Sequence, residues 1–435
     1  MIPIVAATQK YHWGKLGTSS FAGKYSRKTY PNTDEELFQH IHFAEIWMGT
    51  HPKAPSSVVI SENIQQWLTP EFYEANKGKT VSLTSVIDAN RDTFLSKSDI
   101  FLTEDITTGH LPYLFKVLWL ETPLSIQAHP DKTLAEKLHA DFSNVYLDDN
   151  HKPEMVVALT EFEALWSFSD GASIHRRINS VPSVAKFFDS VNIDDLLDES
   201  KFKDTLRLLL KTAYDTPEEV LIECISGMVS EIEAINPEDR ARHQRLALQL
   251  QKHYSCDVGI IVSFFLNYFE LKCGECVVVD VNEPHAWLKG ECIELVAASD
   301  NVVRGGLTPK YKDIGTFLDM LGYETKSYIP YMGERNDLGF ATHVVYNSGH
   351  KEFKLYRYYF HESEEVNDEN IITFNEDDSA ILFVSKGKGK IVDNNNSAEY
   401  EVGFLDSFYC LPGRSFNLRK ATNEDFEVYI ATISD

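Results

Sequence analysis

Residues 111–132 read LPYLFKVLWLETPLSIQAHPDK, and the interpretation of the whole chain starts from this stretch. Its first part, 111–120, is apolar enough for a buried strand, whereas 125–132 carries an amide and an imidazole two positions apart. Because side chains alternate across a strand, Ser125, Gln127 and His129 are predicted to face one side, and Pro130 to end the regular pairing. Such a row of polar side chains raises the question of a metal site.

Two other segments carry residues of the same ligand type. Glu154 precedes the apolar run MVVAL, and His285 lies just before another predicted strand in VNEPHAWLKGECIEL. With Gln127 and His129 they form a set of nitrogen and oxygen donors that suits zinc, although glutamine is an uncommon ligand. Each also has a simpler interpretation: a satisfied polar patch for Gln127 and His129, a strand-edge charge for Glu154 and a turn residue for His285. The residues alone leave both interpretations open.

Length, charge and composition limit the class of protein. A chain of 435 residues is too long for one compact core, so two or three domains are expected. The formal net charge of -25 argues against nucleic acid and anionic membrane surfaces as partners, and an anionic substrate would need a local cationic pocket. No stretch approaches the roughly 18 apolar residues of a membrane span, and the start lacks a signal-peptide pattern. The thinly spread cysteines fit a reducing compartment, so a cytoplasmic protein is expected.

The pattern is helical between about residues 172 and 255, and strand patterns lie on both sides of it. FKDTLRLLLKTAY and EEVLIECISGMVSEIEAI place apolar residues at three- and four-residue spacing. Helix starts are predicted at Asp215–Glu218 and at Asn236–Glu238, where a capping residue is followed by proline. The flanking regions are rich in short strands and turn signals, and the stretch from about 326 onward again reads as strands. The sequence therefore predicts a helical insertion in a mainly β chain.

The pair Cys273 and Cys276 is spaced as in zinc or redox sites. It has no second pair of the same spacing, and Gly274 with Glu275 reads as a turn between two strands. We favour a structural role for this segment.

Six segments in a fixed order resemble the signature segments of type I mannose-6-phosphate isomerase, also called phosphomannose isomerase. They are YHWGKLG, AEIWMGTHP, SIQAHPDK, DDNHKPEM, EPHAWLKGECIE and ASDNVVRGGLTPKYKD, and they span about residues 11–325. The resemblance implies a zinc-dependent aldose–ketose isomerase built on cupin-type (jelly-roll) β-barrels with an inserted α-helical domain. The expected parts are a discontinuous catalytic cupin-type domain at 1–171 and 256–325, a helical domain at 172–255, and a C-terminal cupin-like β domain at 326–435.

The resemblance also assigns the site. Carried over by motif, one Zn²⁺ ion per chain would be held by Gln127, His129, Glu154 and His285. The residues expected to line the pocket are Lys116, Ser125, Lys152, Glu294, Arg304 and Lys310. The substrate would be a small sugar phosphate, and the oligomeric state stays open, with a monomer compatible with everything in the sequence.

The implied reaction requires a base, an electrophile and a phosphate anchor, because a sugar ring must open and a proton must move through an enediolate. Zinc could polarise the carbonyl, with Glu294 as the preferred base and Lys152 helping ring opening. Arg304 is placed at the reacting end, since a guanidinium can donate to two adjacent oxygens without becoming a base. Lys310, with Lys116 and Ser125, is placed on the phosphate.

Other roles are open for these residues. Glu294 could support His285 from outside the ligand set, the lysines could be surface residues, Arg304 an ion-pair partner, and Ser125 a hydroxyl that satisfies nearby backbone. Two positions also depart from the family pattern. Trp287 replaces the usual Tyr, which removes an expected hydroxyl, and Gly305 replaces the usual Ala, which we expect only to loosen the loop after Arg304.

Two rival functions remain at this point. One is a non-catalytic sugar-binding or regulatory cupin, which would lack a ligand or the base. The other is a different metal-dependent cupin enzyme, such as an iron oxygenase that uses two histidines and a carboxylate.

Overall fold

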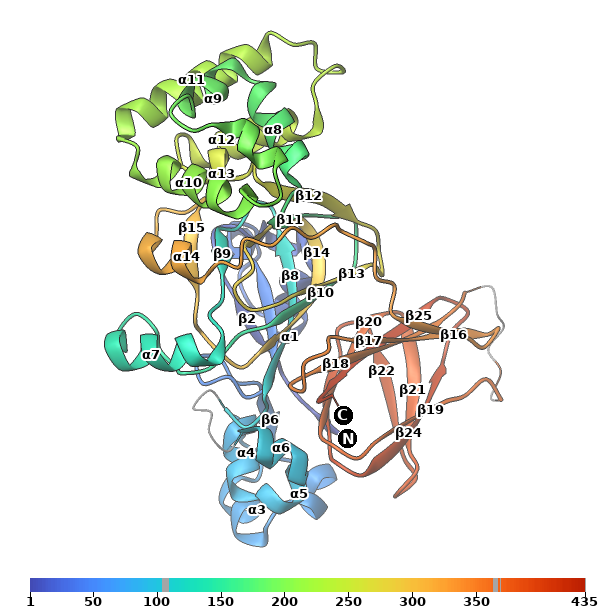
Figure 1. Cartoon of the computed structure of the whole chain (residues 1–435). Coiled ribbons are helices and arrows are strands. Elements are labelled where there is room, and N and C mark those ends of the chain that lie inside the picture. The colour runs from blue at the N-terminus through green and yellow to red at the C-terminus, as the bar shows by residue number, and fades with distance from the viewer. Residues whose placement is uncertain (104–108, 363–366, 368, 435) are drawn as a thin grey trace.

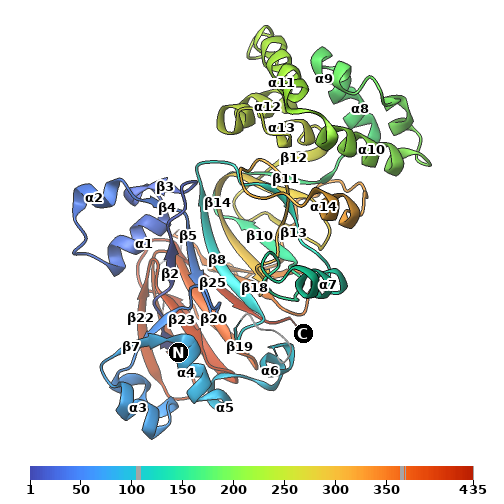
Figure 2. The ribbon, with the colours of Figure 1, turned by 90° about the vertical axis from the view of Figure 1, so that its left-hand side faces the viewer.

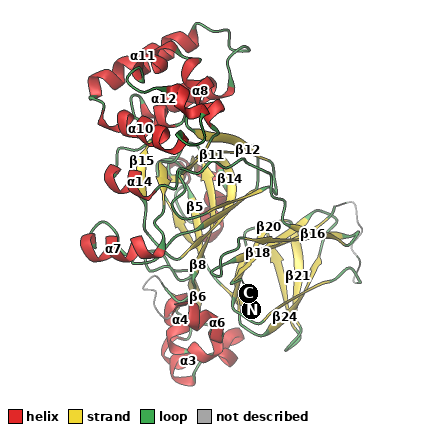
Figure 3. Cartoon of the chain, viewed as in Figure 1, coloured by secondary structure: helices red, strands yellow, loops and turns green. Residues whose placement is uncertain are grey.

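The computed structural model describes residues 1–103, 109–362, 367 and 369–434. Sheets occupy the middle and one side of the molecule, and helices gather at two opposite ends (Figures 1 and 3). Within these ranges no helix has the length and apolar character needed to cross a membrane. The expected combination of extensive β-sheet with helices is confirmed.

The largest sheet contains the strands that carry the predicted ligands. Its members are β2 (Ala7–Gln9), β5 (Glu45–Met48), β8 (Tyr113–Leu120), β9 (Ile126–Ala128), β10 (Glu154–Ala158), β11 (Phe162–Phe168), β12 (Leu266–Leu271), β13 (Cys276–Val279), β14 (His285–Ala297) and β15 (Val303–Gly306). The main path runs β12–β11–β14–β8–β5–β2, while β10 and β9 also pair with β14, β13 pairs with β10, and β15 pairs with β9. The long strand β14 therefore connects the parts of this sheet.

Strand β8 is buried along its whole length, as its continuous apolar sequence predicts. On one face, Phe115, Val117 and Trp119 enter the large core. On the other face, Leu114 and Leu118 join smaller apolar clusters. Both faces are covered by protein, and this is why the strand shows no alternation of apolar and polar residues.

A group of helices lies between β11 and β12 in chain order and forms the upper end of Figure 1, coloured green. The elements are α8 (Gly171–Asn179), α9 (Pro182–Phe187), η3 (Ile193–Leu197), α10 (Phe202–Asp215), α11 (Glu218–Glu233), α12 (Arg242–Tyr254) and α13 (Gly259–Val262). Helix α10 turns Leu206, Leu209 and Leu210 inward at the predicted spacing. These side chains share a core with Ile126 and Leu165 of the sheet, so the helices pack directly on the strands.

One of the two predicted helix starts is wrong. Helix α11 begins at Glu218 after Pro217, as expected. Helix α12, however, begins at Arg242, after a turn over 236–240. The guanidinium of Arg240 explains the turn, because it donates to the carbonyls of Ile232 and Ile235 at 3.1 Å and so caps the end of α11.

The remaining helices and short strands lie around the sheets, with α3 to α6 at the lower end of Figure 1. They are η1 (Gly17–Ser19), α1 (Phe21–Thr29), α2 (Glu35–Gln39), η2 (Glu62–Trp67), α3 (Pro70–Asn76), α4 (Leu83–Ala89), α5 (Arg91–Phe94), α6 (Lys97–Thr103), α7 (Lys132–Phe142), α14 (Ile314–Met320), β3 (Lys15–Leu16), β4 (His42–Phe43), β6 (Ser57–Val59) and β7 (Thr80–Ser82).

The C-terminal region forms two further sheets with a core between them, coloured orange and red in Figure 1. Their strands are β16 (Glu334–Asp337), β17 (Ala341–Asn347), β18 (Lys354–Phe360), β19 (Ile372–Glu376), β20 (Ala380–Lys386), β21 (Lys388–Asp393), β22 (Ala398–Gly403), β23 (Ser407–Cys410), β24 (Arg414–Lys420) and β25 (Phe426–Thr432). The order β23–β20–β25–β18–β17–β16 makes one sheet, which β1 (Ile2–Pro3) extends beside β23, and β19–β24–β21–β22 makes the other. The chain start therefore belongs structurally with the C-terminal sheets.

The C-terminal sheet that contains β20 and β25 packs against the large sheet behind β8 (Figure 2). The hydroxyl of Tyr113 donates to the carbonyl of Ala431 at 2.9 Å, and the rings of Phe115 and Phe383 lie 6.3 Å apart. This contact covers the face of β8 that points away from the predicted ligands.

The CxxC segment forms a turn between β12 and β13, as expected. Gly274 has φ of 85°, which favours glycine. Cys276 is buried in the large core, and Cys273 and Cys276 are both free thiols. The turn is confirmed, and the structural role of the segment stays a prediction.

Candidate active site

Three buried side chains converge where β9, β10 and β14 meet. His129 follows β9, Glu154 begins β10 and His285 begins β14. One ligand-type atom of each lies within 4.8 Å of the others. Nε2 of His129 is 3.0 Å from Glu154 Oε1, and Nε2 of His285 is 3.3 Å from Glu154 Oε2. The fold thus joins three residues that are distant in sequence.

The orientation of the two imidazoles fits a metal ion. Nδ1 of His129 lies 2.6 Å from the carbonyl oxygen of Asn301, and Nδ1 of His285 lies 3.0 Å from the carbonyl oxygen of Glu283. An imidazole that donates Nδ1–H to a carbonyl keeps a lone pair on Nε2. Both Nε2 atoms and Glu154 Oε2 are nevertheless buried without a hydrogen-bond partner in the described ranges. A cation bound between these three atoms would satisfy their lone pairs.

Burial and charge hold two of these groups in the protonation states that a metal requires. Burial, followed by the positive charge of Lys152, lowers the pKa of His129 to about 4. Burial alone would raise the pKa of Glu154, but Lys152 and the two histidines outweigh it and hold that pKa well below its usual range. At neutral pH the imidazole is neutral and the carboxylate is ionised, so both are able to bind a cation.

Gln127 lies next to this cluster, because it is paired with His285 in the strand register. Its neighbours Ile126 and Ala128 point the other way, into the core shared with the helices. Ser125 and Gln127 line a cavity instead. The predicted alternation along this strand is therefore confirmed.

The cavity, of about 380 Å³, gathers the residues expected from the sequence. Those that line it are Lys116, Ser125, Gln127, Lys152, Glu154, Glu294, Arg304 and Lys310. His129 and His285 are buried directly behind them, with no exposed surface. The fold thus assembles the whole predicted set around one space.

Both carboxylate oxygens of Glu294 have a donor. Lys116 Nζ lies 2.8 Å from Oε2, and the indole N–H of Trp287 donates to Oε1 at 2.8 Å. Burial disfavours the ammonium of Lys116, but the charges of Glu294 and Glu45 outweigh it and raise its pKa. Lys116 is therefore engaged in an ion pair and is not a free cation in the cavity.

Lys152 is also paired, whereas Arg304 and Lys310 have no ion-pair partner among the described residues. Lys152 Nζ lies 2.9 Å from Glu154 Oε1. No carboxylate in the described part of the chain pairs with Arg304 or Lys310. Burial lowers the pKa of Arg304, and burial together with the charge of Arg304 lowers that of Lys310, so the two cations are close enough to repel each other. This is the local cationic region that an anionic substrate needs in so acidic a protein.

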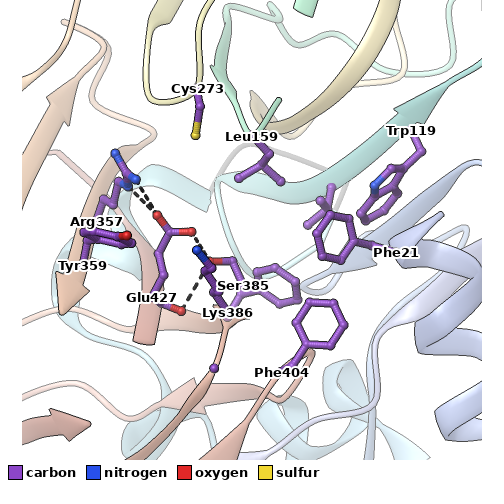
Figure 4. Close-up of a pocket in the computed structure, with 13 residues that line it drawn as sticks. Phe21, Trp119, Leu159, Cys273, Arg357, Tyr359, Ser385, Lys386, Phe404 and Glu427 are labelled. Carbon is purple, nitrogen blue, oxygen red and sulfur yellow. Dashed lines mark hydrogen bonds and ion pairs between the residues drawn. The ribbon is translucent and has the colours of Figure 1, made fainter. Parts of the chain in front are cut away.

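A second cavity, of about 480 Å³, lies behind β8, between the large sheet and the C-terminal sheets (Figure 4). Its apolar wall includes Phe21 and Phe404. Its charged groups already have partners: Arg357 Nη2 lies 2.6 Å from Glu427 Oε1, the hydroxyl of Ser385 donates to Glu427 Oε2 at 2.6 Å, and Lys386 pairs with Asp425. Because its polar groups are already satisfied, we take the smaller cavity beside the His–Glu–His cluster as the candidate active site.

Comparison with known proteins identifies the family. A sequence model described as phosphomannose isomerase type I, catalytic domain, matches residues 1–170. The mannose-6-phosphate isomerase of Homo sapiens is 35% identical over 337 residues, which cover 75% of this chain and 74% of that protein. The chain belongs to the type I phosphomannose isomerase family. It is accordingly an enzyme of the mannose-6-phosphate isomerase class, as its signature segments predicted.

Other members extend this likeness to the full chain. A probable mannose-6-phosphate isomerase of Dictyostelium discoideum is 29% identical over 441 residues, covering 100% of this chain and 94% of that protein. A mutant phosphomannose isomerase from Salmonella typhimurium has a TM-score of 0.76 at 23% identity, over 100% of this chain and 99% of that chain. A mannose 6-phosphate isomerase solved with zinc and yttrium has a TM-score of 0.74 at 23% identity, over 100% of both chains. At this identity the solved structures show a shared phosphomannose isomerase fold.

Gly305, one of the two departures from the family pattern, has a role that the sequence did not reveal. A Cβ at this position would lie 2.4 Å from the ring of Phe317. The carbonyl of Gly305 also accepts a 2.7 Å bond from the hydroxyl of Tyr214. The expectation that this glycine merely loosens a loop is wrong, because it lies within β15 where the packing leaves no room for a side chain.

Several cavity residues of this phosphomannose isomerase received no role from the sequence. Glu45, Trp47 and His51 line the cavity and come from the signature segment AEIWMGTHP. The indole of Trp47 donates to Glu45, and its ring centroid lies 5.4 Å from Lys116 Nζ. The signature segment AEIWMGTHP was the available signal in the sequence for these cavity residues, but only the fold shows which face of the strand meets the cavity.

Asp257 was also missed. Its carboxylate accepts backbone N–H bonds from Leu307 at 2.6 Å and Thr308 at 3.4 Å, and lies 3.5 Å from Lys312 Nζ. It thereby fixes the loop that carries Lys310 into the cavity. No local pattern in the sequence links these segments.

Proposed function

We propose that this isomerase interconverts mannose 6-phosphate and fructose 6-phosphate by proton transfer, with one zinc ion per chain. The observation that carries the proposal is the buried set of His129, Glu154 and His285, three of whose ligand-type atoms have no hydrogen-bond partner in the described ranges. They lie beside a cavity in which Arg304 and Lys310 face no carboxylate partner from those ranges. Gln127 is proposed as the fourth ligand from its place in the register beside His285.

The donor set favours zinc, which is commonly held by nitrogen and oxygen ligands with one position open to substrate. Bound there, zinc would supply a Lewis acid that polarises the sugar carbonyl and orients its neighbouring oxygen. A related mannose 6-phosphate isomerase has been solved with zinc. Two histidines and a carboxylate also suit iron in oxygenases, but that chemistry gives no reason for the unpaired Arg304 and Lys310.

The chain's own residues divide the remaining work. Lys310 and Ser125 bind the phosphate, and Arg304 offsets the charge that develops on the two reacting oxygens. During ring opening Lys152 donates a proton to the ring oxygen as its bond to C1 breaks, and takes up the proton that the C1 hydroxyl releases. Glu294 then removes the proton from C2 and returns it to C1, while the proton of the C2 hydroxyl passes to the oxygen on C1. Because Lys116 is paired with Glu294, we move it from the phosphate to the support of this base.

We further propose the domain division expected from the sequence: a cupin-type catalytic domain at 1–171 and 256–325, interrupted by a helical domain at 172–255, and a C-terminal cupin-like domain at 326–435. The consecutive helices between β11 and β12 support it. Helix α13 ends at Val262, slightly beyond the proposed boundary.

A coupled assay of mannose 6-phosphate turnover tests the metal requirement. Chelation should abolish activity, and stoichiometric zinc should restore it, because no protein group takes the place of a Lewis acid at the carbonyl. Metal analysis of the active protein should give one zinc per chain. Full activity in a verified metal-free sample, or activity that returns only with iron, would contradict the proposal.

A further inference from the structure

Trp287 is buried beside the candidate active site, with 1% of its surface exposed. Its ring centroid lies 5.8 Å from that of Phe162 and 5.2 Å from that of His285. These contacts fix the plane of the indole. Its one polar atom, Nε1, donates to Glu294 Oε1 at 2.8 Å.

This bond exists because the alternation of side chains along β14 is interrupted between Trp287 and Glu294, where the pairing with β11 shifts register. Residues 287 and 294 differ by an odd number of positions, so a regular strand would point their side chains to opposite faces. Gly290, which lies between them, has φ of 115°, and a Cβ there would lie 2.4 Å from the carbonyl of Glu161. At this glycine the strand passes from pairing with β11 to pairing with β8 and β10. The irregularity turns Trp287 and Glu294 toward each other.

Trp287 and Lys116 together hold both oxygens of the Glu294 carboxylate, with Lys116 Nζ 2.8 Å from Oε2. Each oxygen keeps a further lone pair, so the clamp fixes the direction of the carboxylate without blocking proton uptake. An indole N–H neither gains nor loses a proton near neutral pH, so it cannot compete with the carboxylate for the substrate's proton.

We propose that Trp287 is the positioning residue of Glu294: its indole N–H holds the carboxylate in the orientation from which it accepts and returns the sugar's proton. The proposal rests on the role of Glu294 as base given above. It assigns a specific task to the position at which this chain departs from the tyrosine of its family.

Steady-state kinetics of Trp287→Phe measures the effect of removing the donor while keeping an aromatic ring. The loss of one hydrogen bond to a charged group should lower kcat by about 10- to 100-fold. KM should change little, since the bond directs a group that acts on the proton and does not itself anchor the phosphate. A rise in KM at unchanged kcat would overturn the proposal.

Trp119→Phe is the matched control. Trp119 is 0% exposed, lies in the core on the other face of β8 and does not line the candidate active site, and its indole N–H has no hydrogen-bond partner in the described ranges. This variant should lose thermal stability as Trp287→Phe does, because a buried ring is made smaller, but keep kcat within about twofold. An equal fall of kcat in both variants would mean that Trp287 acts only through general packing.

A second measurement tests the bond without reference to catalysis. In protein labelled with ¹⁵N-tryptophan, the indole resonance of Trp287 is assigned by its absence from Trp287→Phe. It should move upfield in Glu294→Gln, because a neutral amide is a weaker acceptor than a carboxylate. An unmoved resonance would overturn the proposal even if Glu294 proves to be the base.

A double-mutant cycle then separates the two hypotheses. In the Glu294→Gln background, Trp287→Phe should cost no further activity, because the group that it positions is gone. An additive loss would contradict the positioning role. If Glu294→Gln alone keeps full activity, the role of Glu294 as base is wrong, and Trp287 then cannot position a base. The shift of the indole resonance still decides whether the hydrogen bond between Trp287 and Glu294 exists.

Discussion

The cations named for the candidate active site form two groups: those paired with a carboxylate, and those without such a partner in the described residues. Lys116 and Lys152 each lie within 3 Å of a carboxylate, at 2.8 and 2.9 Å. Arg304 and Lys310 face the cavity with no carboxylate partner in the described residues. A paired cation mainly shapes its partner, whereas an unpaired one is available to substrate. The two unpaired residues are therefore the sharpest test of the proposed division of roles.

Arg304→Ala should lower kcat by about 10² to 10³ and change KM little, because its guanidinium is proposed to act on charge that develops in the transition state. Steady-state kinetics on mannose 6-phosphate measures both constants. Lys310→Ala is the contrast: as a phosphate anchor, its loss should mainly raise KM. If Arg304→Ala raises KM and leaves kcat intact, the two assignments must be exchanged.

His285→Ala should lose bound zinc and activity together while the protein stays folded. The reason is that Nε2 of His285 is one of the buried atoms directed at the cluster without a partner in the described ranges. Metal content per chain is measured by emission spectroscopy and folding by far-ultraviolet circular dichroism. A folded variant with one zinc per chain would show that His285 is not a ligand.

At the level of elements, the ends of three strands create the candidate metal site and one short strand presents Arg304. β10 and β14 begin at Glu154 and His285, and β9 ends one residue before His129. β15 pairs with β9, which places Arg304 opposite Gln127 in the register. Small shifts of β15 should therefore change the position of Arg304 at the reacting end of the cavity.

Gly305→Ala should displace β15 and lower both stability and kcat, since its Cβ would lie 2.4 Å from the ring of Phe317. Overpacking of this kind typically costs about 1–3 kcal/mol of unfolding free energy. Denaturant unfolding and kinetics measure the two effects, and Phe317→Leu in the same chain should partly restore both.

Gly315→Ala is the control for that substitution. It lies in α14, where an added Cβ would come no closer than 3.9 Å to the nearest atom, Asp313 Oδ1. Alanine should be tolerated or stabilising there. Equal losses from both substitutions would rule out the proposed clash as the cause.

At the level of the whole molecule, the large sheet and the C-terminal sheet share one core. Tyr113 and Phe115 from β8 lie in it together with Phe383 and Tyr429 from β20 and β25. Strand β1, at the start of the chain, pairs with β23 near its end. The two regions should therefore depend on each other for stability.

Phe383→Ala should destabilise the whole chain and not the C-terminal region alone. The side chain is 1% exposed, and removing a buried phenyl ring costs about 3–5 kcal/mol. Chemical denaturation followed by tryptophan fluorescence and by circular dichroism should show one coincident transition, shifted to lower denaturant. If only a separate C-terminal transition shifts, the two regions unfold independently.

Local patterns predicted the positions of part of the candidate ligand set, and the family resemblance supplied the assignment as ligands. Period-two alternation put Ser125, Gln127 and His129 on one face, and apolar runs marked where β10 and β14 begin. The helix start at Asn236–Glu238 was wrong because the chain there forms a turn in which Arg240 caps the end of α11, and the proline signal alone does not reveal that side-chain contact.

The sequence by itself predicted the helical block from the spacing of apolar residues and indicated the family from its signature segments, and the resemblance to that family assigned the candidate ligands. Only the tertiary structure decided which cations are free, that Lys116 belongs to Glu294, and that Gly305 is required by the ring of Phe317. The bond between Trp287 and Glu294 shows the reason most clearly. It needs a strand that breaks its own alternation at Gly290 and exchanges partners there, and such a geometry is set by neighbouring strands and not by local sequence.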